Sequence, residues 1–474
     1  MATIRLNFAE WLPDQTSVTP SLQDINNAVP AANGYVPFPL AVDYSNAASG
    51  TLLGLGTGRF SASTILFAGD ATKLYKFDSA TLNLNNVSKS GGYNGSGWRF
   101  SQFGNIFLAA NSQDRIQAWN VGTSSAFADL AAAAPVAKYL TVIRDFVVAA
   151  NLDGEASPNK VQWSDLGDET NWTSGPTSQS DYQLIPDGGN ITGITGGEFG
   201  VVFLERSIVR MSYIGSPLFF QFDVISRNLG CKYSGTITQY GQMSFFLSED
   251  GFYSCDGQNI YNIGLEKVDR WFFDNVDISR IDTMSCAIDP IRKLVVWNYP
   301  NLSQGRSLLI YNWQLKRWSK ADTTADYIAS AATPGYTLEA LDVFGTLDSL
   351  TTSLDSPLWT GGKFLFAGVS GTKIVTFTGA NSTAVLTTSD IEAGYNSVVT
   401  LARPQIDNGS CTVAVASRKE LDDAITFGTA QATSQEGRVP LRSYGRYHRF
   451  QVTPTGSWTT AIGLDVDVVN QGSR

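Results

Sequence analysis

Histidine is nearly absent from this chain, since His448 is the single one among 474 residues. Most metal-dependent hydrolases, copper oxidases and Ser/His triads need at least one histidine and usually several, so the composition argues against these enzyme classes. His448 lies in "YGRYHRFQV", where residue types alternate as in a strand. Because catalysis needs a constellation of groups, we expect His448 to be structural or to lie at the surface.

Paired cysteines and long apolar runs are also missing. The chain has no CxxC, which argues against a zinc site and favours buried free thiols at its four cysteines, Cys231, Cys255, Cys286 and Cys411. No window approaches 18 uninterrupted apolar residues, so we expect no membrane-spanning segment. The first twenty residues lack the layout of a signal peptide. We expect neither a metal nor a cofactor.

Basic charge is in deficit. The chain has 33 Lys and Arg against 43 Asp and Glu, a net charge of −10 at pH 7. Proteins that bind nucleic acid tightly need a basic surface, so this balance argues against DNA affinity. An acidic protein can still guide DNA without binding it, because it repels phosphate.

What is present is a repeat of short strands. Helical periodicity is scarce, and β-branched and aromatic runs alternate with Gly, Asn, Asp and Ser turns. Such hairpins recur roughly 40 to 70 residues apart, and a four-stranded propeller blade takes about 40 to 50 residues. The pattern predicts an all-β fold with a β-propeller of six or seven irregular blades. The hairpins begin at Thr64, Asn105, Asp145, Gly200, Gln242, Lys293 and Lys363.

Two segments lie outside the repeat. Residues 1–45 are rich in Pro and Asn and are predicted to form an extended N-terminal arm. Residues 46–385 would form the propeller, and residues 386–474 alternate cleanly, which predicts a separate antiparallel β-sandwich domain.

The propeller is predicted to carry an insertion with short helices at about residues 335–360. Gly345 and Pro357 limit any helix there to a few turns. We expect its apolar face to pack on the propeller or on a neighbouring subunit. Five leucines at helical spacing form that face: Leu338, Leu341, Leu347, Leu350 and Leu354.

The stretch "KVQWSDLGDETNWTSG", residues 160–175, is the strongest candidate site, because it sets three acids, Asp165, Asp168 and Glu169, between tryptophans. It resembles the Asp-box hairpin of sialidase-type propellers, with imperfect spacing. We interpret it as a structural turn, because Asp and Gly are turn formers. A catalytic carboxylate pair and a calcium-binding loop remain alternatives. The structural turn residues would be Trp163, Ser164, Asp165, Gly167 and Trp172.

Other suggestive stretches have simpler explanations. "SEDGFYSCDGQN", residues 248–259, carries two Asp-Gly hairpin signals. The glycine-rich residues 54–60 and 188–200 are followed by no GK[ST] and lie in no visible βαβ unit, so they do not predict a nucleotide site.

Ten phrases follow one another along nearly the whole chain: EWLPDQ, GYVPF, GWRFSQFGN, VQWSDLGDETNW, IPDGGNITGITGGEFGVVF, SEDGFY, IGLEKVDRWFF, LLIYNWQLKRWS, LDSLTTSLDSP and GRYHRFQV. In this order and spacing, the chain resembles the tail hub, or nozzle, proteins of short-tailed bacteriophages and related prophages. That resemblance implies a β-propeller with an added β domain and no enzymatic residues.

The resemblance also implies a place in a virion. A hexameric ring would lie below the portal and its tail adaptor, extend the channel through which double-stranded DNA leaves, and give attachment points to tail fibre or tail needle proteins. Assembly would take place in the bacterial host cytoplasm. Acids facing the lumen would repel passing DNA, and the insertion, the N-terminal arm and the C-terminal domain are our candidates for contacts between subunits.

Two other functions remain open from the residues alone. A propeller polysaccharide hydrolase or lyase, such as a phage depolymerase, would use the tryptophans and acids. A scaffold or adhesin propeller would use neither for chemistry.

Overall fold

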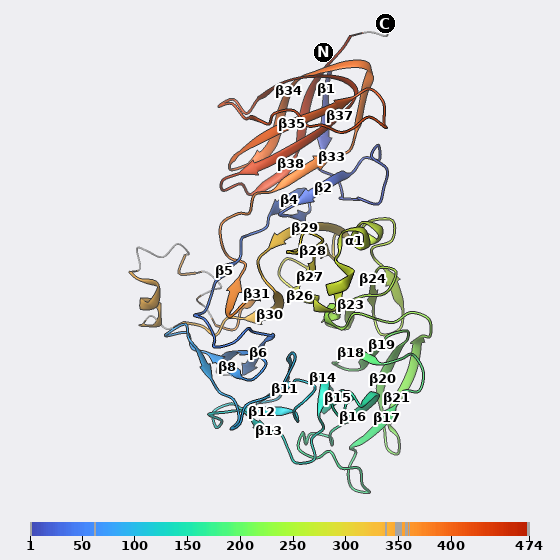
Figure 1. The fold of residues 1–474 in the computed structure, drawn as a ribbon, viewed down its shortest axis with the longest axis vertical. Helices are drawn as coiled ribbons and strands as arrows, with labels where there is room; N and C mark the ends of the chain where they lie inside the picture. The colour runs from blue at the N-terminus through green and yellow to red at the C-terminus, as the bar shows by residue number, and fades with distance from the viewer. Residues whose placement is uncertain are drawn as a thin grey trace.

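The computed structural model describes residues 2–60, 63–336, 339–346, 353–355, 359 and 361–471. These residues form an all-β protein with two parts, a seven-bladed β-propeller and a ten-stranded antiparallel sheet at one side of it (Figure 1). The α-helix α1 (Asp269–Asn275) and the 3-10 helices η1 (Ser234–Thr236), η2 (Ile278–Thr283) and η3 (Glu339–Phe344) lie between strands. In the described residues, no helix has the length and apolarity needed to cross a membrane.

Each blade is a four-stranded antiparallel sheet. Blades one to three are β6 (Gly54–Phe60), β7 (Ser63–Gly69), β8 (Leu74–Phe77), β9 (Leu84–Asn86); β10 (Arg99–Phe103), β11 (Ile106–Ala110), β12 (Gln117–Asn120), β13 (Ala128–Asp129); and β14 (Ala137–Ile143), β15 (Phe146–Leu152), β16 (Ser157–Trp163), β17 (Asp181–Leu184). Blades four and five are β18 (Ile191–Thr195), β19 (Gly200–Leu204), β20 (Ile208–Gly215), β21 (Phe219–Ser226); and β22 (Thr238–Tyr240), β23 (Met243–Leu247), β24 (Phe252–Cys255), β25 (Ile260–Asn262).

The last two blades complete the ring. They are β26 (Ser285–Asp289), β27 (Leu294–Pro300), β28 (Arg306–Asn312), β29 (Arg317–Thr323); and β30 (Tyr327–Ala332), β31 (Phe364–Ser370), β32 (Lys373–Thr376), β5 (Val42–Asp43). The seven predicted hairpins coincide with the two middle strands of the seven blades, so the prediction of a propeller is confirmed and the count is seven. Middle strands such as β15 and β27 are buried at every residue, which is why their apolar runs stand out in the sequence.

Blade seven takes its outer strand from the other end of the chain. Val42 and Asp43 pair with Thr376 and Val375 of β32, so a segment before blade one closes the ring. The closure joins the first and last blades through main-chain pairing. A strand of two residues leaves no hydrophobic pattern, and the sequence did not predict it.

The second part, here called the terminal sheet, is built from both ends of the chain. Its order is β2-β33-β37-β34-β38-β4-β3, with β1 on β38 and β35 and β36 beside β37. The strands are β1 (Ala2–Asn7), β2 (Leu22–Asn26), β3 (Ala28–Ala31), β4 (Gly34–Pro37), β33 (Val385–Thr388), β34 (Ile391–Asp407), β35 (Ser410–Arg418), β36 (Gln431–Ala432), β37 (Val439–Thr455) and β38 (Thr460–Asn470).

This arrangement differs from the predicted separate β-sandwich with an extended N-terminal arm. The strands form one nearly closed, barrel-like sheet, because β34 and β37 are 17 residues long and their pairing shifts register twice. Register shifts of this kind bend strands and let one sheet curl upon itself. Residues 2–37 supply four strands of that sheet, so the predicted extended arm is in fact paired within the fold.

One continuous apolar core joins the two parts. It runs from blades five and six, with Phe252 and Trp297, to the terminal sheet, with Val452 and Trp458. Trp11, fully buried, lies in the same core, and its ring packs edge-on against Trp271 of α1 with centroids 4.9 Å apart. The N-terminal segment therefore fastens the terminal sheet to the propeller.

Candidate functional site

The turn of residues 160–175 begins where β16 ends, at Trp163. The next residue, Ser164, is buried, and its Oγ accepts a hydrogen bond from the N–H of Val147 (3.1 Å) and donates to the carbonyl of Asp165 (3.0 Å). These bonds hold the exit of β16 against β15. The chain therefore leaves the strand in one defined direction.

Asp165 organises the rest of the turn. Its Oδ1 accepts hydrogen bonds from the main-chain N–H of Leu166 (2.9 Å) and of Gln179 (2.8 Å). Its Oδ2 accepts one from Nδ2 of Asn171 (3.0 Å), whose carbonyl takes the N–H of Asp165 in return. Both carboxylate oxygens are thus engaged by this chain's own loop, which is the arrangement of an Asx-type turn.

Gly167 permits the reversal that follows. Its φ of +69° lies in the left-handed region, and its N–H donates to the carbonyl of Asp145 at 2.9 Å. A residue with a Cβ would be strained in that conformation. The turn is therefore bound to the hairpin that starts blade three.

The two tryptophans lie in different cores. Trp163 packs between blades three and four, edge-on to Phe220 with centroids 5.1 Å apart, and its indole N–H donates to the carbonyl of Gln179. Trp172 packs between blades two and three, and its indole N–H donates to the carbonyl of Glu169 at 2.7 Å. Through them the turn anchors blade three to its neighbours on both sides.

The remaining acids of the turn show no pairing suited to acid–base catalysis. Asp168 accepts hydrogen bonds from Oγ1 and the N–H of Thr170 (2.6 and 2.9 Å), and these bonds lower the pKa of the carboxyl. A general acid needs the opposite shift. Within the described residues, no group of three or more His, Cys, Asp or Glu side chains is placed to hold a metal ion.

The second acidic stretch is also a pair of turns. Asp256 accepts hydrogen bonds from the N–H groups of Gln258 and Asn259, and Asp250 accepts one from the Tyr253 hydroxyl. These bonds belong to blade five, whose strands β23, β24 and β25 they connect.

An acid that the sequence did not single out lies under this stretch. Asp269, the first residue of α1, is 7 % exposed, and burial raises the pKa of its carboxyl to about 7. Its Oδ1 accepts the N–H of Phe252, while Oδ2 has no partner among the described residues. Nothing in its sequence context distinguishes it from a helix-starting Asp, so only the fold reveals the burial.

His448 lies inside the terminal sheet. Burial lowers the pKa of its imidazole to about 4, so the ring is neutral near pH 7. Ser397 Oγ donates to the carbonyl of Gly445, so Nε2 donates to Ser397 (2.7 Å) and Nδ1 accepts from Ser417 (2.6 Å). Both ring nitrogens are satisfied by serines, an arrangement that suits a structural role.

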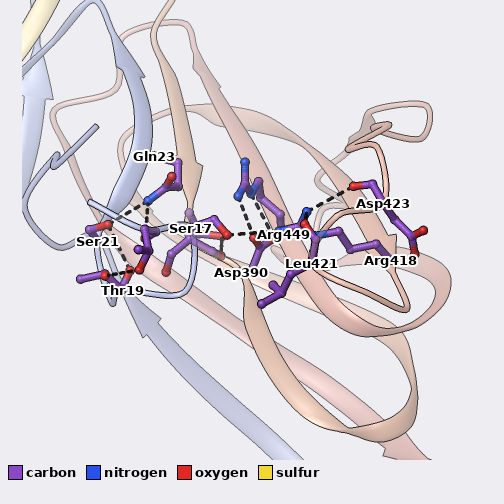
Figure 2. A network of polar contacts seen from close by, with 12 residues as sticks. Ser17, Thr19, Ser21, Gln23, Asp390, Arg418, Leu421, Asp423 and Arg449 are labelled. Atoms are coloured by element: carbon purple, nitrogen blue, oxygen red, sulfur yellow. Dashed lines mark hydrogen bonds and ion pairs between the residues drawn. The ribbon is translucent and has the colours of Figure 1, made fainter. Parts of the chain in front are cut away.

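Among the described residues, three buried charged side chains form an ion triad in the terminal sheet (Figure 2). Asp390 forms ion pairs with Arg418 and with Arg449, the latter at 2.8 Å, and the three side chains are at most 10 % exposed. Arg418 also donates to the Ser17 hydroxyl and to the carbonyls of Leu421 and Asp423. The triad therefore links the N-terminal segment to the C-terminal strands.

The predicted insertion is described only in part. Leu341, in η3, is buried, and Leu354 is 51 % exposed, whereas Leu338, Leu347 and Leu350 lie outside the described residues. At the base of the insertion, the rings of Trp359 and Tyr336 meet edge-on at 5.5 Å, and Tyr336 also meets Tyr44. The base is thus held on the propeller beside blade seven.

Comparison with known proteins assigns the chain to no family. No family model matches the chain, and no curated protein shows significant similarity to it.

Proposed function

We propose that this chain is a structural subunit of a bacteriophage tail, the hub or nozzle, which forms a hexameric ring below the portal and tail adaptor. The architecture carries the proposal: a ring of seven blades closed by β5 shares one core with a sheet that contains both chain ends. A closed ring of blades that shares its core with a second sheet is an architecture that suits the wall of a conduit. The ordered phrases along the sequence support the same assignment.

The conduit for DNA would lie between subunits. The innermost strands of the propeller leave a cavity of about 320 Å³, which suits a small molecule and not a duplex whose major groove alone is about 12 Å wide. The net charge of −10 suits a wall that repels phosphate. In this proposal the ring retains the genome and lets it pass, and binds no DNA sequence.

Two surfaces are our candidates for contacts with other subunits, the adaptor and the fibres. Because β1–β4 pair inside the chain, the N-terminal segment is less suited to reach a partner than the sequence suggested. The insertion and the terminal sheet remain as the candidate contact surfaces. Figure 1 shows η3, coloured brown, standing out to the side of blade seven.

Copy number tests the proposal. Native mass spectrometry of the purified chain, alone and mixed with portal and adaptor, should give six copies per ring. Deletion of residues 335–359 should lower ring yield if the insertion lies between subunits, and normal rings would exclude it from that contact. Release of reducing sugar from host polysaccharide, without ring formation, would contradict the proposal and favour a depolymerase.

A further inference from the structure

A cavity of about 320 Å³ lies at the propeller axis. Apart from Trp98 and Phe107, its lining residues belong to β6, β10, β22, β26 and β30, the innermost strands of blades one, two, five, six and seven. Strands of blades that are not neighbours meet in one cavity only where the inner edges converge. The volume falls in the range of small-molecule sites, roughly 300–1,000 Å³.

Arg99, the first residue of β10, brings a positive charge to this cavity. The side chain is partly buried and forms no ion pair with any carboxylate of the described residues. The ionisable groups that act on it are the phenols of Tyr327 and Tyr139 and the thiol of Cys286, whose pKa burial raises to about 12. None of these groups is a carboxylate, so none of them is the usual counter-ion of a guanidinium.

The surrounding charges do not change this balance. Lys138, on β14, is near enough to interact with Arg99, and it is itself paired with Glu155 at 2.9 Å. Among the described residues that line the cavity, none is a carboxylate. A cation held away from bulk water without a counter-ion is costly, and an anion from solution would offset that cost.

Hydroxyl groups in the wall can donate to the same anion. Ser101, two residues after Arg99 on β10, makes no side-chain hydrogen bond to another described residue. The Thr57 hydroxyl accepts the N–H of Ala332 (3.2 Å), so its own hydrogen is available to donate. Tyr327 lies within hydrogen-bonding reach of the guanidinium and presents a third hydroxyl.

The inner ring around the cavity is held by repeated side-chain clamps. Gln102 on β10 accepts the N–H of Arg59 (2.8 Å) and donates to its carbonyl (2.5 Å), which ties blade two to blade one. Gln239 on β22 does the same to Gly196, between blades four and five. The strand that carries Arg99 is therefore fixed before any ligand arrives, which reduces the ordering cost of binding.

We propose that this axial cavity binds a small oxyanion, of which inorganic phosphate and sulfate are the simplest members. The Arg99 guanidinium supplies charge-assisted hydrogen bonds in the fork geometry that matches such anions. The hydroxyls of Ser101, Thr57 and Tyr327 complete the donor set. The inference does not depend on the proposed role in a phage tail.

Isothermal titration of the full-length chain with inorganic phosphate, and separately with sulfate, tests the site in a chloride buffer of matched ionic strength. The wild-type chain should bind with one site and a saturable heat, and its Tm should rise with the logarithm of anion concentration above the Kd. Arg99→Gln should weaken binding at least about tenfold, because the charge-assisted bonds are lost. Arg59→Gln is the matched control, since Arg59 is on the neighbouring inner strand but exposed, and it should bind as wild type.

Two milder variants keep the test decisive if Arg99→Gln fails to fold. Ser101→Ala and Tyr327→Phe each remove one donor and should each weaken binding by about threefold to tenfold, the usual worth of a neutral hydrogen bond. Absence of saturable binding to the wild-type chain would overturn the proposal. So would unchanged affinity in Arg99→Gln, or in both milder variants.

Discussion

The propeller and the terminal sheet are built from similar strands by opposite routes. Within each blade of the propeller, a strand pairs with the next one along the chain, and only β5 in blade seven departs from this order. In the terminal sheet, Ala2 pairs with Val468 and Leu22 with Thr388. The first pattern repeats in the sequence and can be read there, whereas the second depends on where the two ends of the chain meet.

Disruption of the Asp390 triad should have the largest effect, and it should be felt in the terminal sheet. Asp390→Ala leaves the guanidinium groups of Arg418 and Arg449 buried without a counter-ion, which should lower the free energy of unfolding by about 3–5 kcal/mol. Urea unfolding measures the loss. Glu436→Ala, which removes the exposed pair with Arg438 in the same part of the chain, should cost less than about 1 kcal/mol. Equal losses of unfolding free energy in Asp390→Ala and Glu436→Ala would contradict a stabilising role for the buried triad.

The buried acid on the propeller side should make stability fall as pH rises. The carboxyl of Asp269 has a pKa of about 7 in the folded chain and an ordinary pKa near 4 in the unfolded chain. Between about pH 4 and pH 7, the folded chain therefore keeps a proton on Asp269 that the unfolded chain has released. Its contribution is complete below about pH 4 and is lost as pH rises through 7, an effect of about 4 kcal/mol. Asp269→Asn should remove that slope in unfolding measured from pH 4 to 8. A variant with the wild-type slope would contradict the burial of Asp269.

The terminal sheet should respond to pH in the opposite sense. His448 has a pKa of about 4 when folded and about 6.5 when unfolded, so the unfolded chain takes up the proton first as pH falls. Its contribution is complete above about pH 6.5 and is lost as pH falls through 4, an effect of about 3 kcal/mol. His448→Gln should flatten this acid limb. If the limb keeps its wild-type slope, His448 does not titrate as a buried neutral ring.

The turn of residues 160–175 should show a smaller, structural effect. Asp165→Asn removes charge from an acceptor of three hydrogen bonds and should cost about 1.5–3 kcal/mol, because bonds to charged groups contribute that much. Glu169 contributes to the turn through its main-chain carbonyl, which accepts the indole N–H of Trp172. Glu169→Gln keeps that carbonyl and should change the free energy of unfolding by less than about 0.5 kcal/mol. We expect the wild-type chain to show no hydrolytic activity, so neither variant should lose any. An assay for polysaccharide cleavage by the wild-type chain, Asp165→Asn and Glu169→Gln checks this.

The sequence predicts what is local in this molecule. The seven hairpins are visible because their middle strands are buried on both faces, and the turn residues are visible because Asp and Gly have distinct turn chemistry. β5 is two residues long, and the strands of residues 1–37 lack the clean alternation of residues 386–474. Only β3 and β4 pair with each other locally, while β1, β2 and β5 pair with strands hundreds of residues away, so no local pattern reports those partners.

The charged and buried groups were harder to predict. Arg99 lies in an ordinary strand sequence, Asp269 at a helix start and Asp390 between two strands, and each becomes unusual only because of what the fold packs around it. His448 was conspicuous as the single histidine, but its two serine partners come from other strands. Burial and pairing are tertiary properties that residue type alone does not report.

Electron microscopy of the purified chain, alone and after mixing with portal and adaptor, tests the central claim most directly. We expect a six-fold ring that docks on the adaptor, with the propellers around an open lumen. A strictly monomeric particle that joins neither the portal nor the adaptor would contradict the claim.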